Sequence, residues 1–282
     1  MESTNTATRA CPGRVHGPAD SRISRVAILC LSLLLLLVGA TCEDSAGKPV
    51  LTVLADSSLK DAFGALSESF ERANPDADVR FRFEDSNSLI QRLRNGDVAD
   101  LVVTAGTSTM QELETAGLVQ RPSTLTSNVL MVATRDGLTG FNAFEDLANQ
   151  GLRIAVAAPG TSAGAYADAG ILSAAAGLGE DWKQSVLSNM LEREADTRAV
   201  LEKVRTSAAD AGIVYRSDLT SLATDVAIGA LPFPARLGLA VVYPAALTAR
   251  PPEVVLAKAF FDFMLSDDGQ AILEGFGFGA SQ

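Results

Sequence analysis

The sequence predicts an α/β protein of two lobes, in which mostly parallel sheets are flanked by helices. Short apolar segments alternate along the chain with segments whose apolar residues recur at helical spacing. Glycine and alanine are abundant and aromatic residues make up 6% of the chain, which suits tight turns between strands and helices. The chain has 282 residues, enough for two lobes of roughly 100–150 residues each.

The first 41 residues are predicted to be a signal peptide. Arg22 and Arg25 precede an apolar run of 13 residues, Val26–Val38. A membrane-spanning helix needs about 20 residues, so the run favours a cleaved signal over a transmembrane anchor. The mature chain is therefore expected outside the cytoplasmic membrane, as a cell-surface lipoprotein or a periplasmic protein.

Two cleavage positions fit the end of the apolar run. Small residues at Val38-Gly39-Ala40 would leave Thr41 first, whereas Gly39-Ala40-Thr41-Cys42 resembles a lipobox with Cys42 as the lipid anchor. We favour the lipoprotein because a polar segment follows directly, and residues 42–49 are predicted to be its tether. The chain would then meet the membrane through the lipid alone.

Composition favours a binding protein over an enzyme. No cysteine follows Cys42, and the only histidine is His16, inside the signal peptide. The absence of histidine and of any cysteine after Cys42 excludes Cys–His and Ser–His–Asp nucleophiles and the common zinc sites from the mature chain. Without residues 1–41, 19 basic and 32 acidic residues remain, a net charge of −13, which makes nucleic acid a poor partner. We expect no enzymatic activity and no cofactor.

Strands and helices alternate in the first part of the chain. Its strands are short and apolar or alternate apolar and charged residues, and its helices end at Asn-Pro, Asn-Gly or Gly. The strands are predicted at 50–54, 79–83 and 101–103, and the helices from 59 to the Asn-Pro pair at 74–75, at 86–94 and at 108–116. This order implies parallel strands with crossover helices.

A second series of elements follows a polar stretch at 121–127. Strands are predicted at 128–134, 154–157, 212–215 and 238–242, helices near 163–176, 181–191, 197–206 and 251–265, and a return crossing at 231–234. The closing helices need a sheet to cover, so the first lobe is predicted to be discontinuous. Lobe I is assigned to 50–127 and 233–282, and lobe II to 128–232.

Small hydroxyl residues recur where a strand gives way to a helix. Ser58, Ser86, Ser162 and Thr197 stand at such positions, and Asp61 follows Ser58 at the spacing of a capping box. Taken singly, these serines fit ordinary helix caps, which does not exclude a second role. Four helix N-termini, each with roughly half a positive charge, would together balance a dianion without any Arg or Lys.

Two segments of the chain, Val53–Leu59 and residues 212–218, carry recognisable motifs. They resemble the A-A-A-S-L opening and the G-I-V-Y-x-S-D block of the molybdate-binding proteins of bacterial ABC transporters, the ModA family. Further similar segments lie, in the family's order, at residues 83–89, 95–101, 113–118, 159–166 and 269–278. The resemblance implies the two-lobed type II periplasmic binding protein fold, with the ligand in the cleft between the lobes.

The resemblance also implies a ligand site, in which hydroxyl and backbone N–H groups donate to the oxygens of molybdate. The family's binding residues fall on Ser58, Ser86, Ala163, Thr197 and Tyr215, and Ser57 is a candidate for an additional donor. These residues would reach molybdenum only through the oxyanion, without direct metal ligation. The implied partners are a permease and its ATPase, and a monomer that binds molybdate and tungstate is expected.

Two acidic residues depart from the family pattern. Asp56 and Asp85 stand where the family has Ala or Ser, and an inward carboxylate would repel a dianion. We expect both to face outward as caps. Arg92 and Arg94 are interpreted as a solvated helix face, and Trp182 as a packing residue.

Alternatives from three classes stay open on the sequence. Another tetrahedral oxyanion, sulfate above all, fits the same donors, because cavity size rather than donor chemistry separates the two. An enzyme on the same scaffold, such as a hydroxymethylbilane synthase, needs a cysteine that the mature chain lacks. A purely adhesive surface lipoprotein would not need serines at four helix starts.

Overall fold

The computed structural model describes residues 48–222, 227–237 and 239–279. The predicted signal peptide, Cys42 and most of the tether lie outside the described residues. In the part that is described, no helix is long and apolar enough to cross a membrane.

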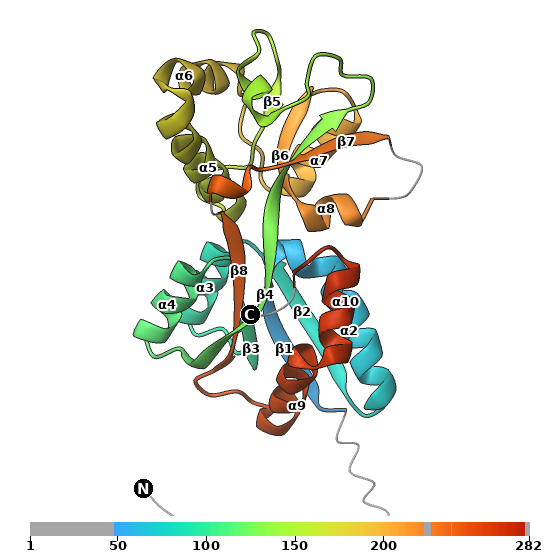
Figure 1. Ribbon diagram of the computed structural model, residues 1–282. Helices are drawn as coiled ribbons and strands as arrows, with labels where there is room; N and C mark the ends of the chain where they lie inside the picture. The colour runs from blue at the N-terminus through green and yellow to red at the C-terminus, as the bar shows by residue number, and fades with distance from the viewer. Residues whose placement is uncertain (1–47, 223–226, 238, 280–282) are drawn as a thin grey trace, which may run out of the picture. The chain divides into compact units, whose positions relative to one another are not determined.

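The first lobe is built on three parallel strands, β1 (Val50–Asp56), β2 (Asp78–Glu84) and β3 (Leu101–Val103). The covering helices are α2 (Lys60–Ala73), α3 (Ser86–Arg94), α4 (Thr107–Thr115), α9 (Val254–Leu265) and α10 (Asp267–Gly275). Figure 1 shows α2, α9 and α10 on one face of this sheet and α3 and α4 on the other. Phe70 of α2 packs edge-on against Phe260 of α9, with ring centroids 5.0 Å apart. The helical spacing of Leu59, Ala62, Phe63, Leu66 and Phe70 predicts the buried face of α2.

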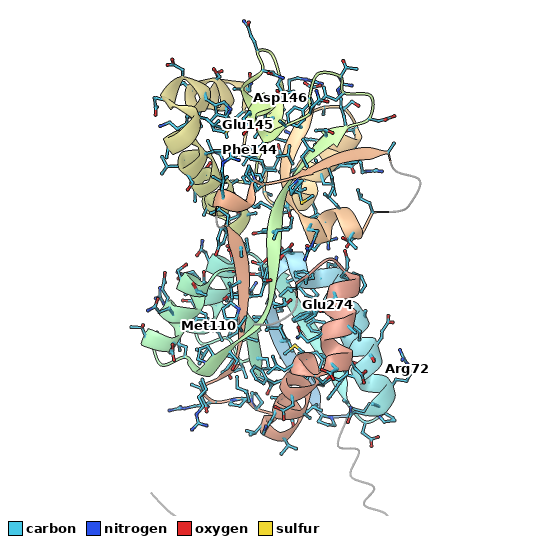
Figure 2. The ribbon with its side chains drawn as sticks, in the orientation of Figure 1. Arg72, Met110, Phe144, Glu145, Asp146 and Glu274 are labelled. Atoms are coloured by element: carbon cyan, nitrogen blue, oxygen red, sulfur yellow. The ribbon has the colours of Figure 1, made fainter. Side chains whose placement is uncertain are left out.

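The second lobe contains the strands β5 (Ile154–Ala155), β6 (Ala211–Tyr215) and β7 (Ile228–Pro232). Its helices are α5 (Ser162–Leu178), α6 (Glu180–Asn189), α7 (Thr197–Arg205) and α8 (Arg216–Thr220), with short 3-10 turns η2 (Phe144–Ala148) and η3 (Ala235–Leu237). Trp182 packs here as predicted, because its ring lies 5.6 Å from that of Phe144, which Figure 2 labels.

Two long strands, β4 (Val119–Arg135) and β8 (Ala240–Thr248), connect the lobes. From Val119 to Val129, β4 pairs with β8, and from Leu130 onward it pairs with β6 and β7. All these pairings are antiparallel, as is that of β3 with β8, so the sheets are more mixed than the sequence predicted. β4 and β8 cross between the lobes in opposite directions, and this makes their pairing antiparallel.

The α/β, two-lobed fold predicted from the sequence is confirmed, but β4 begins earlier than expected. The stretch 121–127, interpreted as a polar connection, belongs to this strand, whose register shifts twice there. β4 therefore runs without interruption through the predicted lobe boundary at 127/128. The residue boundaries of the lobes stay a prediction.

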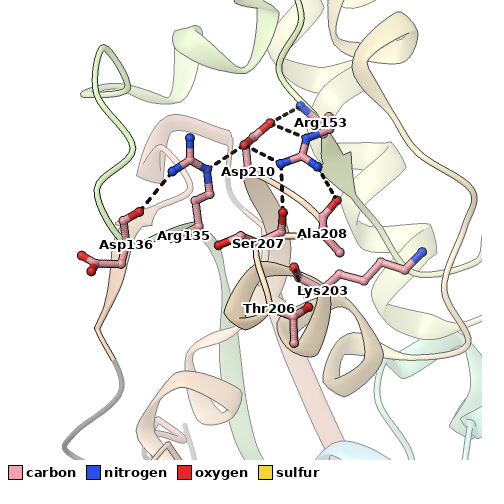
Figure 3. A network of polar contacts seen from close by, with 8 residues as sticks. All are labelled: Arg135, Asp136, Arg153, Lys203, Thr206, Ser207, Ala208 and Asp210. Atoms are coloured by element: carbon pink, nitrogen blue, oxygen red, sulfur yellow. Dashed lines mark hydrogen bonds and ion pairs between the residues drawn. The ribbon is translucent and has the colours of Figure 1, made fainter.

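An ion-pair network ties together three strand ends in the second lobe. Asp210, just before β6, accepts hydrogen bonds from Arg135 Nε at 2.7 Å and from Arg153 Nε at 3.0 Å (Figure 3). Arg135 ends β4 and Arg153 precedes β5, so one carboxylate fixes the three strands to one another. Both arginines hold the pKa of Asp210 below its usual range.

Candidate anion-binding site

The parallel register of β1 and β2 brings two helix starts side by side. Asp56 and Glu84 are paired at the carboxyl ends of these strands, and the chain turns into a 3-10 turn, η1 (Ser57–Leu59), and into α3 directly afterwards. Ligands of open α/β sheets bind at this end of the strands. In the second lobe, α5 and α7 begin at Ser162 and Thr197.

These four starts face one small cavity. Of the residues predicted as ligand donors, Ser57, Ser58, Ala163, Thr197 and Tyr215 line it. The cavity leaves about 30 Å³ for the centres of water-sized atoms, where one water needs about 10–15 Å³. A ligand in this closed form of the site must therefore be compact.

The capping residues are not the predicted serines but residues one or two positions earlier. Asp85 accepts from the N–H groups of Asn87 and Ser88, and Thr161 accepts from the N–H of Gly164. Asp196 caps α7 in the same way. The predicted capping role of Ser58 is wrong, because the carboxylate of Asp56 caps η1 and Asp61 pairs instead with Arg198.

Since the caps lie outside the helices, the hydroxyl residues sit in the first turn, where backbone N–H groups have no partner within the helix. Among the described residues, the N–H groups of Ala163 and Thr197 make no hydrogen bond. These two amides are therefore available to a ligand.

Gly164 allows the turn before α5 to pack closely, because a Cβ there would lie 2.0 Å from the carbonyl oxygen of Ala158.

Tyr215, the last residue of β6, carries a hydroxyl without a partner. Its oxygen is the only buried side-chain polar atom of the described residues that forms no hydrogen bond. Burial raises the pKa of Tyr215 well above its usual value, so the hydroxyl keeps its proton. An unpartnered buried donor at a cavity wall is costly unless a ligand accepts from it.

Asp56 contradicts the expectation that it faces outward. Its side chain is buried, lines the cavity, and accepts from the hydroxyls of Ser58 and Ser86, each at 2.7 Å. Burial raises the pKa of Asp56, although the two serines oppose this by hydrogen bonding to the ionised form. Asp85 is half-buried and caps α3 as expected, but it lines the cavity instead of facing outward.

Ser86 is the predicted donor that does not line the cavity. It is fully buried, and its Oγ accepts from the N–H of Ala105 at 2.8 Å while donating to Asp56. Ser86 therefore reaches the cavity only indirectly, through its hydrogen bond to Asp56.

A second buried carboxylate lies behind the second-lobe donors. Asp218 accepts from the N–H of Tyr215 at 2.8 Å and is hydrogen-bonded to the side chain of Thr197. Burial raises the pKa of Asp218 to about 6. This arrangement fixes the two donors relative to each other. Asp218 was not among the site residues predicted from the sequence.

Three polar contacts join the lobes around the cavity. Asn87 Nδ2 donates to the Gly160 carbonyl at 2.6 Å, and Ser162 Oγ donates to the Ala105 carbonyl at 3.0 Å. Arg198 forms an ion pair with Asp61 at 2.8 Å. The lobes are thus held in the arrangement in which all four helix starts face the same cavity.

Positive side chains and metal ligands do not build this site. None of the residues that line the cavity is Lys or Arg. Arg92 pairs with Glu84 and Asp97, and Arg94 with Glu112, which agrees with the predicted helix face. Within residues 48–222, 227–237 and 239–279, no cluster of three or more His, Cys, Asp or Glu could hold a metal ion.

Two lobes that close on a small cavity of backbone and hydroxyl donors define a solute-binding protein. Residues 51–279 match the family of bacterial extracellular solute-binding proteins, and the chain belongs to this family. The prediction of a binding protein rather than an enzyme is confirmed by this membership.

Individual relatives are similar over most of the chain. The molybdate-binding protein ModA of Mycobacterium tuberculosis is 32% identical over 234 residues, which cover 82% of this chain and 85% of that protein, and this confirms the predicted resemblance. The substrate-binding domain of a putative molybdenum ABC transporter from Clostridium difficile is 25% identical, with a TM-score of 0.67 over 83% of this chain and 99% of that one. The sulfate-binding protein SubI from Mycobacterium tuberculosis, 18% identical, shares the fold, with a TM-score of 0.70 over 81% of this chain and 86% of that one.

Proposed function

We propose that this chain captures molybdate outside the cytoplasmic membrane and delivers it to the permease and ATPase of an ABC importer. The similarity to molybdate-binding ModA over most of the chain supports this ligand. The observation that carries the proposal is the unpartnered hydroxyl of Tyr215, which lines the same cavity as the free amides of Ala163 and Thr197.

Donor chemistry is consistent with this ligand. Molybdate is fully deprotonated at neutral pH, so each of its oxygens accepts hydrogen bonds. The two amides can only donate, the unpartnered Tyr215 hydroxyl has its proton free to donate, and Ser58 and Ser57 carry hydroxyls that can donate. Tungstate has the same charge and shape, and we expect it to bind comparably. No cofactor is needed for capture.

Delivery of molybdate to a membrane permease is consistent with a monomer that is tethered to the same membrane. We propose that Cys42 carries lipid and that residues 42–49 act as the tether, so that the lobes reach the permease from the membrane surface. Stable anchoring needs more than one acyl chain, which lipoprotein maturation supplies.

Isothermal titration calorimetry of the mature protein with molybdate, tungstate, sulfate and phosphate tests the ligand. We expect molybdate and tungstate to bind with dissociation constants of about 1 μM or tighter, and sulfate far more weakly. A preference for sulfate or phosphate would refute molybdate as the ligand while leaving the family membership intact.

A further inference from the structure

The carboxylate of Asp56 lies between the hydroxyls of Ser58 and Ser86, and the proposed function needs the Ser58 hydroxyl as a donor to the ligand. Oδ1 accepts from the Ser58 N–H at 3.1 Å and from Ser58 Oγ at 2.7 Å, and Oδ2 accepts from Ser86 Oγ at 2.7 Å. Asp56 is 5% exposed and lines the cavity, so it cannot turn to solvent without breaking these contacts.

The hydroxyl protons of Ser58 and Ser86 limit how many hydrogen bonds the two serines can donate. Each hydroxyl has one proton, and an ionised carboxylate has none. Ser86 Oγ accepts from the Ala105 N–H and therefore gives its own proton to Asp56. Ser58 Oγ contacts both Asp56 and, at 2.9 Å, the hydroxyl of Tyr243. If Ser58 donates to ionised Asp56, Tyr243 donates to Ser58, and neither serine has a proton left.

A fully deprotonated oxyanion accepts hydrogen bonds and cannot donate them. With Asp56 ionised, the anion would meet an oxygen lone pair of Ser58 and a buried negative charge behind it. A proton on Asp56 Oδ1 removes both conflicts. Oδ1–H then donates to Ser58 Oγ, and the Ser58 proton turns toward the anion, while Ser86 continues to donate to Oδ2.

The other groups around Asp56 do not supply compensating positive charge. Asp85 lies near enough to raise the pKa of Asp56 further, and the hydroxyls of Tyr215 and Tyr243 stay protonated. Asp218 is a further buried carboxylate close to both tyrosines. Arg198, the basic residue that acts on Asp218, is paired with Asp61.

We propose that Asp56 carries a proton in the anion-bound protein, so that the site takes up one proton with each fully deprotonated oxyanion. This inference rests on the proposed function, since it takes molybdate as the probe. It assigns Asp56, where the related motif has Ala, as the residue that makes affinity depend on pH.

Calorimetry with molybdate from about pH 6 to about pH 9, in pairs of buffers with different ionisation enthalpies, measures the proton uptake. In the wild type, uptake should approach one proton per molybdate above the pKa of Asp56 in the free protein. The affinity should fall there by up to about tenfold per pH unit. Asp56→Asn should abolish both effects. Asp85→Asn is the matched control, because Asp85 lines the same cavity without contacting Ser58. This variant should still take up one proton per molybdate, with the onset of uptake moved to lower pH, because the charge of Asp85 raises the pKa of Asp56.

Infrared difference spectroscopy provides a second readout. Molybdate-bound wild type should show the C=O band of a protonated carboxyl group that is absent from Asp56→Asn. Molybdate binding without this band, or proton uptake that survives in Asp56→Asn, overturns the inference and leaves the proposed function standing. A wild type that binds no molybdate at any pH refutes the proposed function, and the inference with it.

Discussion

Replacing Tyr215 by Phe separates the binding role of a buried hydroxyl from its structural role. The Tyr215 hydroxyl has no partner among the described residues, and the phenyl ring keeps the same shape. In the free protein the substitution therefore breaks no hydrogen bond and removes a desolvated polar group. In the molybdate complex it removes a donor to a charged acceptor.

The two effects have opposite signs. A buried unsatisfied group costs about 1–3 kcal/mol, so the free variant should be as stable as the wild type or more stable, with Tm rising by about 2–4 °C per kcal/mol gained. A hydrogen bond to a charged group contributes about 1.5–3 kcal/mol, so molybdate affinity should fall about ten- to a hundredfold.

Calorimetry gives the affinity, and thermal unfolding with and without molybdate gives both stabilities. Tyr243→Phe is the matched control, because the equally buried Tyr243 hydroxyl contacts Ser58 Oγ at 2.9 Å. That variant should lose stability in the free protein. The reasoning is refuted if Tyr215→Phe lowers the Tm of the free protein, or if it leaves the molybdate affinity unchanged.

Three further substitutions test other parts of the structure. Ser86→Ala leaves Asp56 Oδ2 and the Ala105 N–H each without a partner, so Tm should fall by the equivalent of about 1–3 kcal/mol and molybdate binding should weaken, as calorimetry and thermal unfolding would show. Asp210→Ala should cost about 2–4 kcal/mol at pH 7 in denaturant titrations. Because the folded pKa of Asp210 is depressed, this contribution is present above about pH 4 and lost as the pH falls, so wild type and variant should converge in acid. Cys42→Ala should release the protein from the membrane fraction, whereas a wild-type mature chain whose intact mass starts at an unmodified Thr41 would contradict the lipid anchor.

The order of strands and helices could be predicted because each depends on local pattern. Leu59, Phe63, Leu66 and Phe70 recur at helical spacing, and three of them form the buried face of α2, while Leu59 is buried in the preceding turn. The early start of β4 could not be predicted, because the polar residues of 121–127 are stabilised by pairing with β8, more than a hundred residues later. Pairing between distant segments leaves no periodic signal in either one.

The positions around the cavity could also be predicted, but the direction of one side chain could not. Ser58, Ala163, Thr197 and Tyr215 meet at one cavity, although their contact with a ligand stays a prediction. An Asp just before a helix is equally consistent with a capping side chain that faces outward and with one that faces inward. The inward direction of Asp56 follows from the parallel register of β1 and β2, which brings Ser86 within hydrogen-bond distance.

The charge balance at the cavity supports a protonated Asp56 independently of the hydrogen bonds. Four helix starts contribute roughly half a positive charge each, or about two in all. Asp56, Asp85 and Asp196 cap three of these starts and also line the cavity. If all three are ionised, they exceed the positive field even before a dianion arrives. Asp85 and Asp196 are less buried than Asp56, so water screens their charges better. A proton on Asp56 therefore removes the least screened of these three negative charges from the cavity in which we propose that the anion binds.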